Sequence, residues 1–283
     1  MQPNLRYVLR RESNLTPWTS GQPALIVNAD DWGRDNENTD RTLECIASGV
    51  VSSVSAMVFM EDSERAAVVA RERTIDAGLH LNFTTPFTAP NCSELLLDHQ
   101  LRIAGCLRRH RLAQSLFYPS LVRSFEYVVS AQLDEYRRLY GAEPERLDGH
   151  HHMHLCANVL ATGLLPSGTV VRRNFSFRAG EKSFGNRLYR QVVDRMLARR
   201  HHLTDFFFSL PPLEPRSRLD RIFSLAQSSV VELETHPVMP DEYKFLRGSE
   251  MRHQIGEALA SAGGCQLMQG ESLDPTLTSG ILR

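Results

Sequence analysis

The stretch Ala24-Leu25-Ile26-Val27-Asn28-Ala29-Asp30-Asp31-Trp32-Gly33 decides how this chain folds. Its apolar part is too short for a buried helix and is rich in branched side chains, so it predicts an interior β-strand. Adjacent carboxylates at the end of such a strand cost desolvation energy unless a partner compensates them, and a metal ion is the usual partner. The stretch therefore predicts a strand that delivers Asp30 and Asp31 to a site.

Other strand-like segments also end in imidazoles. His80 closes Ala77-Gly78-Leu79-His80, followed by Leu81-Asn82, and a histidine run follows Leu147-Asp148-Gly149 at positions 150, 151, 152 and 154. A fourth segment, residues 230–237, ends in Thr235-His236-Pro237. Carboxylates and histidines at the ends of separate parallel strands are what a divalent-metal hydrolase site needs.

Each of these features has a purely structural alternative. An Asp-Asp pair often satisfies backbone N–H groups in a turn or at a helix start. A lone His80 is more often a hydrogen-bonded core residue, and His236 could be a turn histidine before proline. Arg172 and Arg173 end another strand-like run. One of them could orient a carboxylate or touch substrate, and the structural alternative is a surface ion pair with an acidic residue.

The histidine run is the hardest of these to explain structurally. If its strand continues, His150, His152 and His154 fall on one face and repeat every ~6.6 Å. Adjacent members could then reach one metal, but all three could not on a straight strand. A metal or catalytic role for at least one of them is the better interpretation.

Strand-like and helix-like segments alternate along the chain. Strands are predicted at 24–29, 53–59, 76–82, 146–150, 169–173, 204–209, 229–235 and, more weakly, 265–269; helices are predicted near 37–49, 61–73, 119–140, 183–201, 215–227 and 248–262. Such alternation with apolar strands predicts an α/β fold, a parallel sheet covered by helices. Seven or eight units suggest a barrel, complete or distorted, with reactive residues at the carboxyl ends of its strands.

Two regions fall outside this alternation. Residues 1–22 are polar and form an N-terminal arm, and we expect residues 23–283 to be one domain. Residues 84–118 form an insertion directly after His80-Leu81-Asn82. An insertion there would serve as a lid or substrate wall, or alternatively as an oligomer contact.

Composition describes an ordinary globular protein that can bury a large core. Of 283 residues, 42% are hydrophobic and 23% charged, and the net charge is −1. No overall field favours nucleic acid or an anionic membrane, and the arginines look scattered along the sequence. Five widely spaced cysteines without a CxxC pair, no secretory signal and no membrane span lead us to expect reduced thiols and a cytoplasmic protein.

Four sequence blocks in this order resemble the YdjC-like carbohydrate deacetylases. The blocks are Asn28–Gly33, Gly78–Asn82, Leu147–His154 and Thr235–Pro237, and they span roughly residues 24–240. That family includes chitooligosaccharide deacetylases and relatives associated with hopanoid biosynthesis. The arm and the 84–118 insertion lie outside the match. Trp32 stands where the family more often has phenylalanine.

The resemblance implies a distorted (β/α) TIM-like barrel of seven or eight parallel strands, of the glycoside hydrolase/deacetylase type. It implies a metal-dependent hydrolase that removes an N-acetyl group from an amino sugar or short N-acetylated oligosaccharide. Carried over by motif, Asp31, His80 and His150 are metal ligands, Asp30 is the general base, and His236 is a plausible general acid. Arg172, Asn82, His152 and His154 are then candidates for substrate-binding or supporting roles.

The chemistry of these residues agrees with the resemblance. Amide hydrolysis needs an activated water, stabilisation of an oxyanion and a proton for the departing amine. The resemblance implies one Mg²⁺, whereas two imidazoles and a carboxylate suit Zn²⁺ better. We expect the chain to bind an N-acetylated sugar, to bind no nucleic acid and to have no membrane span. We also expect it to form a homodimer.

Two other functions stay open at this stage. A phosphoesterase or amidohydrolase on a barrel also uses metal-binding histidines, but such sites usually draw a second metal from further strand ends. A catalytically silent sugar-binding or scaffold protein would keep the barrel but lose the catalytic residues. Intact Asp30, Asp31, His80 and His150 argue against the silent barrel.

Overall fold

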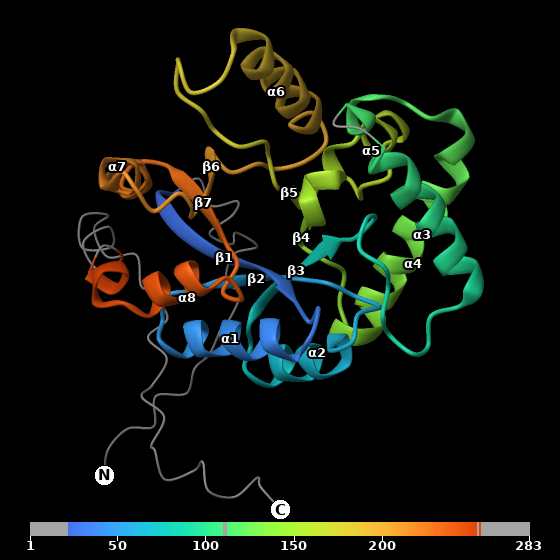
Figure 1. Ribbon diagram of the computed structural model, residues 1–283, viewed down its shortest axis with the longest axis horizontal. Helices are drawn as coiled ribbons and strands as arrows, with labels where there is room; N and C mark the ends of the chain where they lie inside the picture. The colour runs from blue at the N-terminus through green and yellow to red at the C-terminus, as the bar shows by residue number, and fades with distance from the viewer. Residues whose placement is uncertain (1–21, 110–111, 254, 256–283) are drawn as a thin grey trace, which may run out of the picture.

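The computed structural model describes residues 22–109, 112–253 and 255 and contains one seven-stranded sheet (Figure 1). All neighbouring strands pair in parallel in the order β5-β4-β3-β2-β1-β7-β6. The strands are β1 (Ala24–Trp32), β2 (Ser53–Ala56), β3 (Asp76–Leu81), β4 (Arg146–Gly149), β5 (Val170–Val171), β6 (Phe206–Ser209) and β7 (Val230–Thr235).

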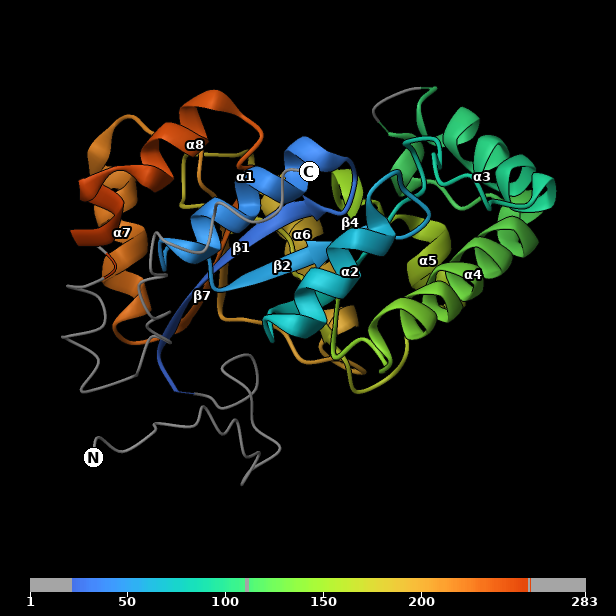
Figure 2. The same cartoon turned by 90° about the horizontal axis from the view of Figure 1, so that it is seen from below.

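Eight helices lie between or after these strands, and residues 249–253 and 255 are also helical. The eight are α1 (Asn36–Ala47), α2 (Ser63–Glu72), α3 (Glu94–Leu107), α4 (Val122–Tyr140), α5 (Ala157–Thr162), α6 (Phe184–Leu197), α7 (Arg216–Ala226) and α8 (Pro240–Arg247), with short 3₁₀ turns at Ala113–Ser115, Pro119–Leu121 and His150–Leu155. Seen from below, α1 and α2 lie in front of β1 and β2, and α3 lies beside α4 (Figure 2). Helices α1 and α2 thus cover the outer face of β1 and β2.

The prediction of a distorted barrel is confirmed, and the distortion is an open side. The sheet ends at β5 on one edge and β6 on the other, and these two strands do not pair within the described residues. A single bridge joins Val170 to His202, just before β6. The predicted strand at 265–269, the N-terminal arm before Gln22 and the end of the predicted 248–262 helix lie outside the described residues.

Three helices were not predicted. α3 lies inside the 84–118 insertion and packs on α4, and α5 and α8 follow β4 and β7. The signal for α3 was present, because Ser93 caps its first turn and buried apolar residues recur at 96, 103, 104 and 107. Arginine and histidine residues between these positions made the helical spacing of the apolar residues hard to recognise in the sequence.

A close approach between β3 and β4 gives a stability prediction. A Cβ added at Gly78 would lie 2.7 Å from Nη1 and 2.8 Å from Cζ of Arg146. That guanidinium is buried and donates to the Val54 carbonyl at 2.8 Å and to Ser55 Oγ at 3.2 Å, so it cannot move away cheaply. We expect Gly78→Ala to lower the free energy of unfolding by about 1–3 kcal/mol.

Urea denaturation checks this, with Gly105→Ala as the matched control. A Cβ at Gly105 in α3 meets nothing within 4 Å, so that change should stabilise the chain by about 0.5–1 kcal/mol. Equal unfolding midpoints for Gly78→Ala and the unmodified chain would contradict the prediction.

Candidate metal and active site

A bulge near the end of β1 turns both aspartates toward the inside of the curled sheet. In a regular strand their side chains would point to opposite faces. The pairing with β2 shifts register between Ala29 and Trp32, and Asp31 adopts a left-handed φ of 63°. Both Asp30 and Asp31 are buried. The expected break in the strand is therefore a bulge, and it brings the pair to one site.

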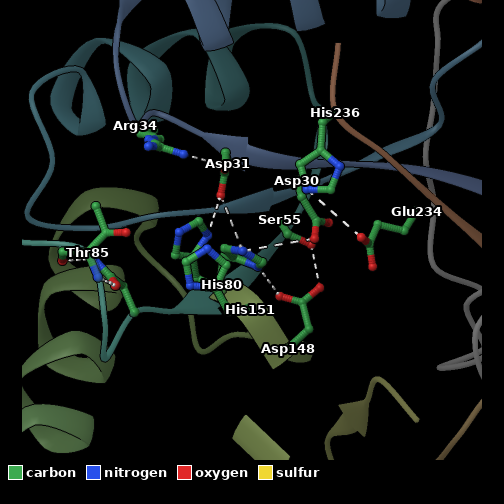
Figure 3. A network of polar contacts seen from close by, with 12 residues as sticks. Asp30, Asp31, Arg34, Ser55, His80, Thr85, Asp148, His151, Glu234 and His236 are labelled. Carbon is green, nitrogen blue, oxygen red and sulfur yellow. Dashed lines mark hydrogen bonds and ion pairs between the residues drawn. The ribbon is translucent and has the colours of Figure 1, made fainter. Parts of the chain in front are cut away.

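Asp31 lies beside two imidazoles from neighbouring strand ends (Figure 3). Its Oδ1 atom is 3.4 Å from His80 Nε2 and 2.9 Å from His150 Nδ1, and all three side chains are buried. Among the described residues this oxygen accepts no well-aligned hydrogen bond. Ligands at ~2.0–2.2 Å from a tetrahedral cation lie ~3.3 Å apart. The three atoms therefore fit the shell of one divalent cation.

Contacts on the far side of each ligand hold this arrangement. Arg34 Nη1 donates to Asp31 Oδ2 at 2.9 Å, which leaves Oδ1 facing the imidazoles. His80 Nδ1 lies 2.7 Å from Asp148 Oδ1. A carboxylate at Nδ1 holds a proton there and leaves Nε2, which faces Asp31, as the nitrogen whose proton a metal would replace; this is the usual support for a metal-binding histidine.

The electrostatics of the site favour positive charge. Burial lowers the pKa of His80, but the carboxylates of Asp148 and Asp30 outweigh it and raise the pKa to about 10. Burial raises the pKa of Asp31, but the imidazoles of His150 and His80 hold it well below its usual range. A divalent cation would satisfy the same ionised carboxylates.

The strand does not continue through the histidine run. β4 ends at Gly149, and His151 and His152 both have left-handed φ values, 55° and 57°. The one-face arrangement of His150, His152 and His154 is therefore wrong, because the tight turn sends each ring in a different direction. Only the first histidine of the run reaches Asp31.

The other histidines of the run have separate surroundings. His152 Nε2 lies 3.5 Å from Glu234 Oε2, and its ring packs edge-on against Phe175. Nε2 of the buried His154 lies 2.9 Å from the Arg172 carbonyl oxygen. His152 therefore lies beside the site, whereas His154 supports the backbone beneath it.

Arg172 is the central cation of the site, and the surface ion pair considered for it is wrong. Its guanidinium is buried and binds Asp30 through two 2.7 Å hydrogen bonds. It also donates to Glu232 at 2.7 Å, and Asp148 and Glu234 lie 2.9 and 3.6 Å away. The same guanidinium thus contacts carboxylates from β1, β4 and β7.

The pKa values of two of these carboxyls, Asp30 and Glu234, shift in opposite directions. Burial raises the pKa of Asp30, but Arg172 and His80 outweigh burial and leave it below its usual value. Burial and the nearby Asp30 charge raise the pKa of Glu234 well above its usual range. Carboxyls whose environments separate their pKa values are candidates for a base and an acid.

His236 follows β7 and remains partly exposed. Glu242 accepts hydrogen bonds from the His236 backbone N–H at 2.8 Å and from Thr235 Oγ1 at 2.9 Å. The ring nitrogens Nε2 and Nδ1 each lie 3.9 Å from a carboxylate, that of Glu234 and of Glu242 respectively. The imidazole is therefore placed between two acidic residues at the edge of the site.

Asn82 holds the turn that follows β3. Its buried side chain accepts from the backbone N–H groups of Thr84 and Thr85 and donates to the Thr85 carbonyl at 2.7 Å. The turn places Thr84 Oγ1 2.9 Å from His151 Nδ1. The start of the 84–118 insertion thus lies beside the site, as a substrate wall would require, and α3 packs away on α4.

Sequence reasoning missed four supporting carboxyls: Asp148, Glu232, Glu234 and Glu242. A signal existed for three of them. Asp148 directly precedes the histidine run, and Glu232 and Glu234 interrupt an otherwise apolar strand. Charges within a buried strand need partners, so they could have been assigned to the site.

Two further groupings of possible ligands contain Asp30, one with His80 and Asp148 and one with Glu234 and His236. Both Asp30 oxygens already bind the Arg172 guanidinium. A second cation there would face that positive charge. The grouping of Asp31, His80 and His150 is therefore the best fit for a cation.

The fold and site define an α/β half-barrel with a two-histidine, one-aspartate centre at its strand ends. The sequence model for the YdjC-like protein family matches residues 24–265, so the chain belongs to that family.

Named relatives match part of the chain. It is 32% identical over 140 residues to the carbohydrate deacetylase of Mus musculus, covering 48% of this chain and 44% of that protein. It is 31% identical over 133 residues to the chitooligosaccharide deacetylase of Proteus mirabilis, covering 46% and 50%. The matched region spans about half the length of these curated relatives.

A solved structure supports the fold. An Enterococcus faecalis protein proposed to cleave cellobiose phosphate superposes with a TM-score of 0.57 at 17% identity, covering 86% of this chain and 96% of that one. In the described part of the chain, no helix has the length and apolar character needed to cross a bilayer.

The contact between His80 and Asp148 yields a prediction. Asp148→Asn should weaken Zn²⁺ binding about 10–100-fold, because the amide no longer fixes the Nδ1 proton of His80. Competition against a chromophoric chelator measures the affinity. Asp98→Asn, an exposed position in α3 paired with Arg102, is the control and should leave it unchanged. Equal affinities in the two variants would remove Asp148 as a support of the centre.

Proposed function

We propose that this chain is a divalent-cation-dependent hydrolase that removes an N-acetyl group from an amino sugar or a short N-acetylated oligosaccharide. The observation that carries the proposal is the convergence of Asp31, His80 and His150 beside the ionised Asp30. Membership of the YdjC-like family and the names of the matched relatives support the choice of reaction and substrate class.

Asp31, His80 and His150 would hold the cation. When bound, it supplies Lewis acidity, which makes water more acidic and stabilises negative charge on the acetyl oxygen. The two imidazoles favour Zn²⁺, because Mg²⁺ prefers an all-oxygen shell, whereas the family resemblance implies Mg²⁺. Activity after chelation and reloading with each ion in turn separates these alternatives.

Asp30 is the proposed general base. Arg172 fixes the carboxylate with two hydrogen bonds, and Asn28 Nδ2 donates a third to Oδ1 at 2.7 Å. The ion pair keeps Asp30 ionised and oriented. It also makes the carboxylate a weaker base, so orientation next to the reacting atoms would supply most of its effect.

His236 is the proposed proton donor to the departing amine. It is partly exposed at the edge of the site, and Glu242 fixes its backbone. Imidazole is the side chain that most often acts as a general acid in enzymes. Glu234 is a second candidate donor, because its pKa is raised well above its usual range and its Oε2 atom lacks a hydrogen-bond partner among the described residues.

One assay separates deacetylation from the other functions. Acetate release from N,N′-diacetylchitobiose, lost on chelation and restored by a divalent cation, is the expected result. Phosphate release from a sugar phosphate without acetate release would favour the phosphoesterase reading. Sugar binding without either product would indicate a silent barrel. The homodimer and the cytoplasmic location stay predictions.

The adjacent aspartates should respond differently to the same change. Asp31→Asn should lose cation affinity first and recover part of its rate with added cation, because it removes a ligand oxygen. Asp30→Asn should keep cation affinity and lose about 10²–10⁴-fold in kcat, as expected for a general base. Paired Zn²⁺ titrations and rate measurements test this. Equal loss of affinity in both variants would refute the division of roles.

His236→Ala and Glu234→Gln distinguish the two candidate donors. If His236 supplies the proton, His236→Ala should slow hydrolysis of the N-acetyl amide about 10²–10⁴-fold and spare an activated acetyl ester, whose leaving group needs no proton. Glu234→Gln should then change kcat little on either substrate. The reverse pattern would assign the proton donor to Glu234. An undiminished rate of amide hydrolysis in both variants would show that neither residue is the proton donor.

A further inference from the structure

Helix α6 carries an exposed apolar stripe. Phe184, Leu188, Val192 and Met196 recur every four residues and are 74%, 45%, 46% and 44% exposed. At 100° per residue they lie, with exposed Tyr189, on one side of the helix. The opposite side supplies the buried residues Val193, Asp194 and Leu197. An exposed stripe of this length marks an interaction surface.

A second exposed apolar segment extends the stripe. Leu112, Leu116 and Phe117, which flank the short turn at Ala113–Ser115, are also exposed. Ser115 Oγ donates to the Tyr189 hydroxyl at 3.4 Å, so the two segments touch. Together they hold eight of the thirteen large apolar side chains that are exposed in the described part of the chain. We call this surface the α6 patch.

The α6 patch is strongly basic although the chain is nearly neutral. Residues 184–200 contain five arginines and one acid, Asp194. Of these arginines, the exposed Arg195 lies on the same side of α6 as the apolar stripe, and the exposed Arg199 follows just after the helix. Asp194 is buried and accepts from Arg173 and Asn174, so it does not neutralise the exposed side. Arg195 and Arg199 thus place positive charge beside the exposed apolar residues of α6.

The same buried contacts fix α6 to the site. Arg173 and Asn174 directly follow Arg172, whose guanidinium holds Asp30. Figure 1 shows α6 apart from the other helices, above the ends of β5 and β6 in that view. Helix α6 therefore lies at the open side of the half-barrel, where buried contacts of Asp194 hold it to the chain next to Arg172.

We propose that the α6 patch binds the surface of an anionic phospholipid bilayer. An amphipathic helix with aromatic and aliphatic residues on one side and arginines around them inserts its apolar side at the headgroup boundary, and anionic lipids add electrostatic attraction. A second copy of the chain is a poorer occupant, because two arginine-rich patches would repel each other. This goes beyond the proposed hydrolase function and does not depend on it.

Vesicle co-sedimentation of the full chain tests the proposal. The chain should sediment with vesicles of phosphatidylcholine and phosphatidylglycerol, bind pure phosphatidylcholine far more weakly, and be released by high salt. Phe184→Ser with Leu188→Ser should reduce the partition coefficient about ten-fold or more, because both side chains lose apolar contact. Arg195→Gln and Arg199→Gln should each reduce it about five-fold.

Matched controls lie on α2, at exposed positions far from the patch in sequence. Val68→Ser and Arg71→Gln should leave vesicle binding unchanged. Both sets of variants should melt like the unmodified chain. The proposal is overturned if the unmodified chain ignores anionic vesicles or if the Phe184/Leu188 variant binds them equally well. It is also overturned if sedimentation velocity shows a dimer that this variant converts to monomer, since a second copy would then cover the stripe.

Discussion

The buried guanidinium of Arg172 is the charge on which the rest of the site depends. It comes from the chain just beyond β5, at one edge of the sheet, and contacts carboxylates on β1, β4 and β7. The side chain therefore crosses the interior of the half-barrel and ties its strands together electrostatically. Removing one partner of a buried ion pair leaves an uncompensated charge, at a cost of about 3–5 kcal/mol. A site with this many buried carboxyls could not persist without that cation.

Parallel pairing decides which residues meet the guanidinium. Ala29 aligns with Thr235, and His80 aligns with Asp148, so residues that follow these positions arrive at the same end of the sheet. Regular strands alone would still send half of the side chains to the wrong face. The left-handed backbone at Asp31 and at His151 breaks the strand alternation there, so that Asp31 and His150 both point into the site. Such backbone persists only where surroundings impose it, here through contacts of Asp31 with Arg34 and of His151 with Thr84.

The sequence was sufficient for the parts of this structure that depend on local pattern. The parallel strands, and the meeting of carboxylates and imidazoles at their ends, follow from apolar runs that end in polar residues. The choice of Asp31, His80 and His150 among those residues came from the family resemblance. The turn after β4 could not be predicted, because two consecutive left-handed histidines are allowed only by tertiary contacts. The role of Arg172 was equally hidden, since its partners lie on other strands, Asp148 on β4, Glu232 on β7 and Asp30 on β1.

The protonation pattern of the site follows from the same guanidinium. Asp30 binds it through both oxygens, whereas Glu234 approaches it only at 3.6 Å and lies near the Asp30 charge. One cation thus stabilises the ionised form of the first carboxyl and leaves the second in surroundings that favour its neutral form. A site with an ionised and a neutral carboxyl holds a proton acceptor and a proton donor at the same pH. This division requires that Arg172 remain ordered, and the anchoring of α6 to the adjacent Arg173 and Asn174 helps to keep that part of the open side in place.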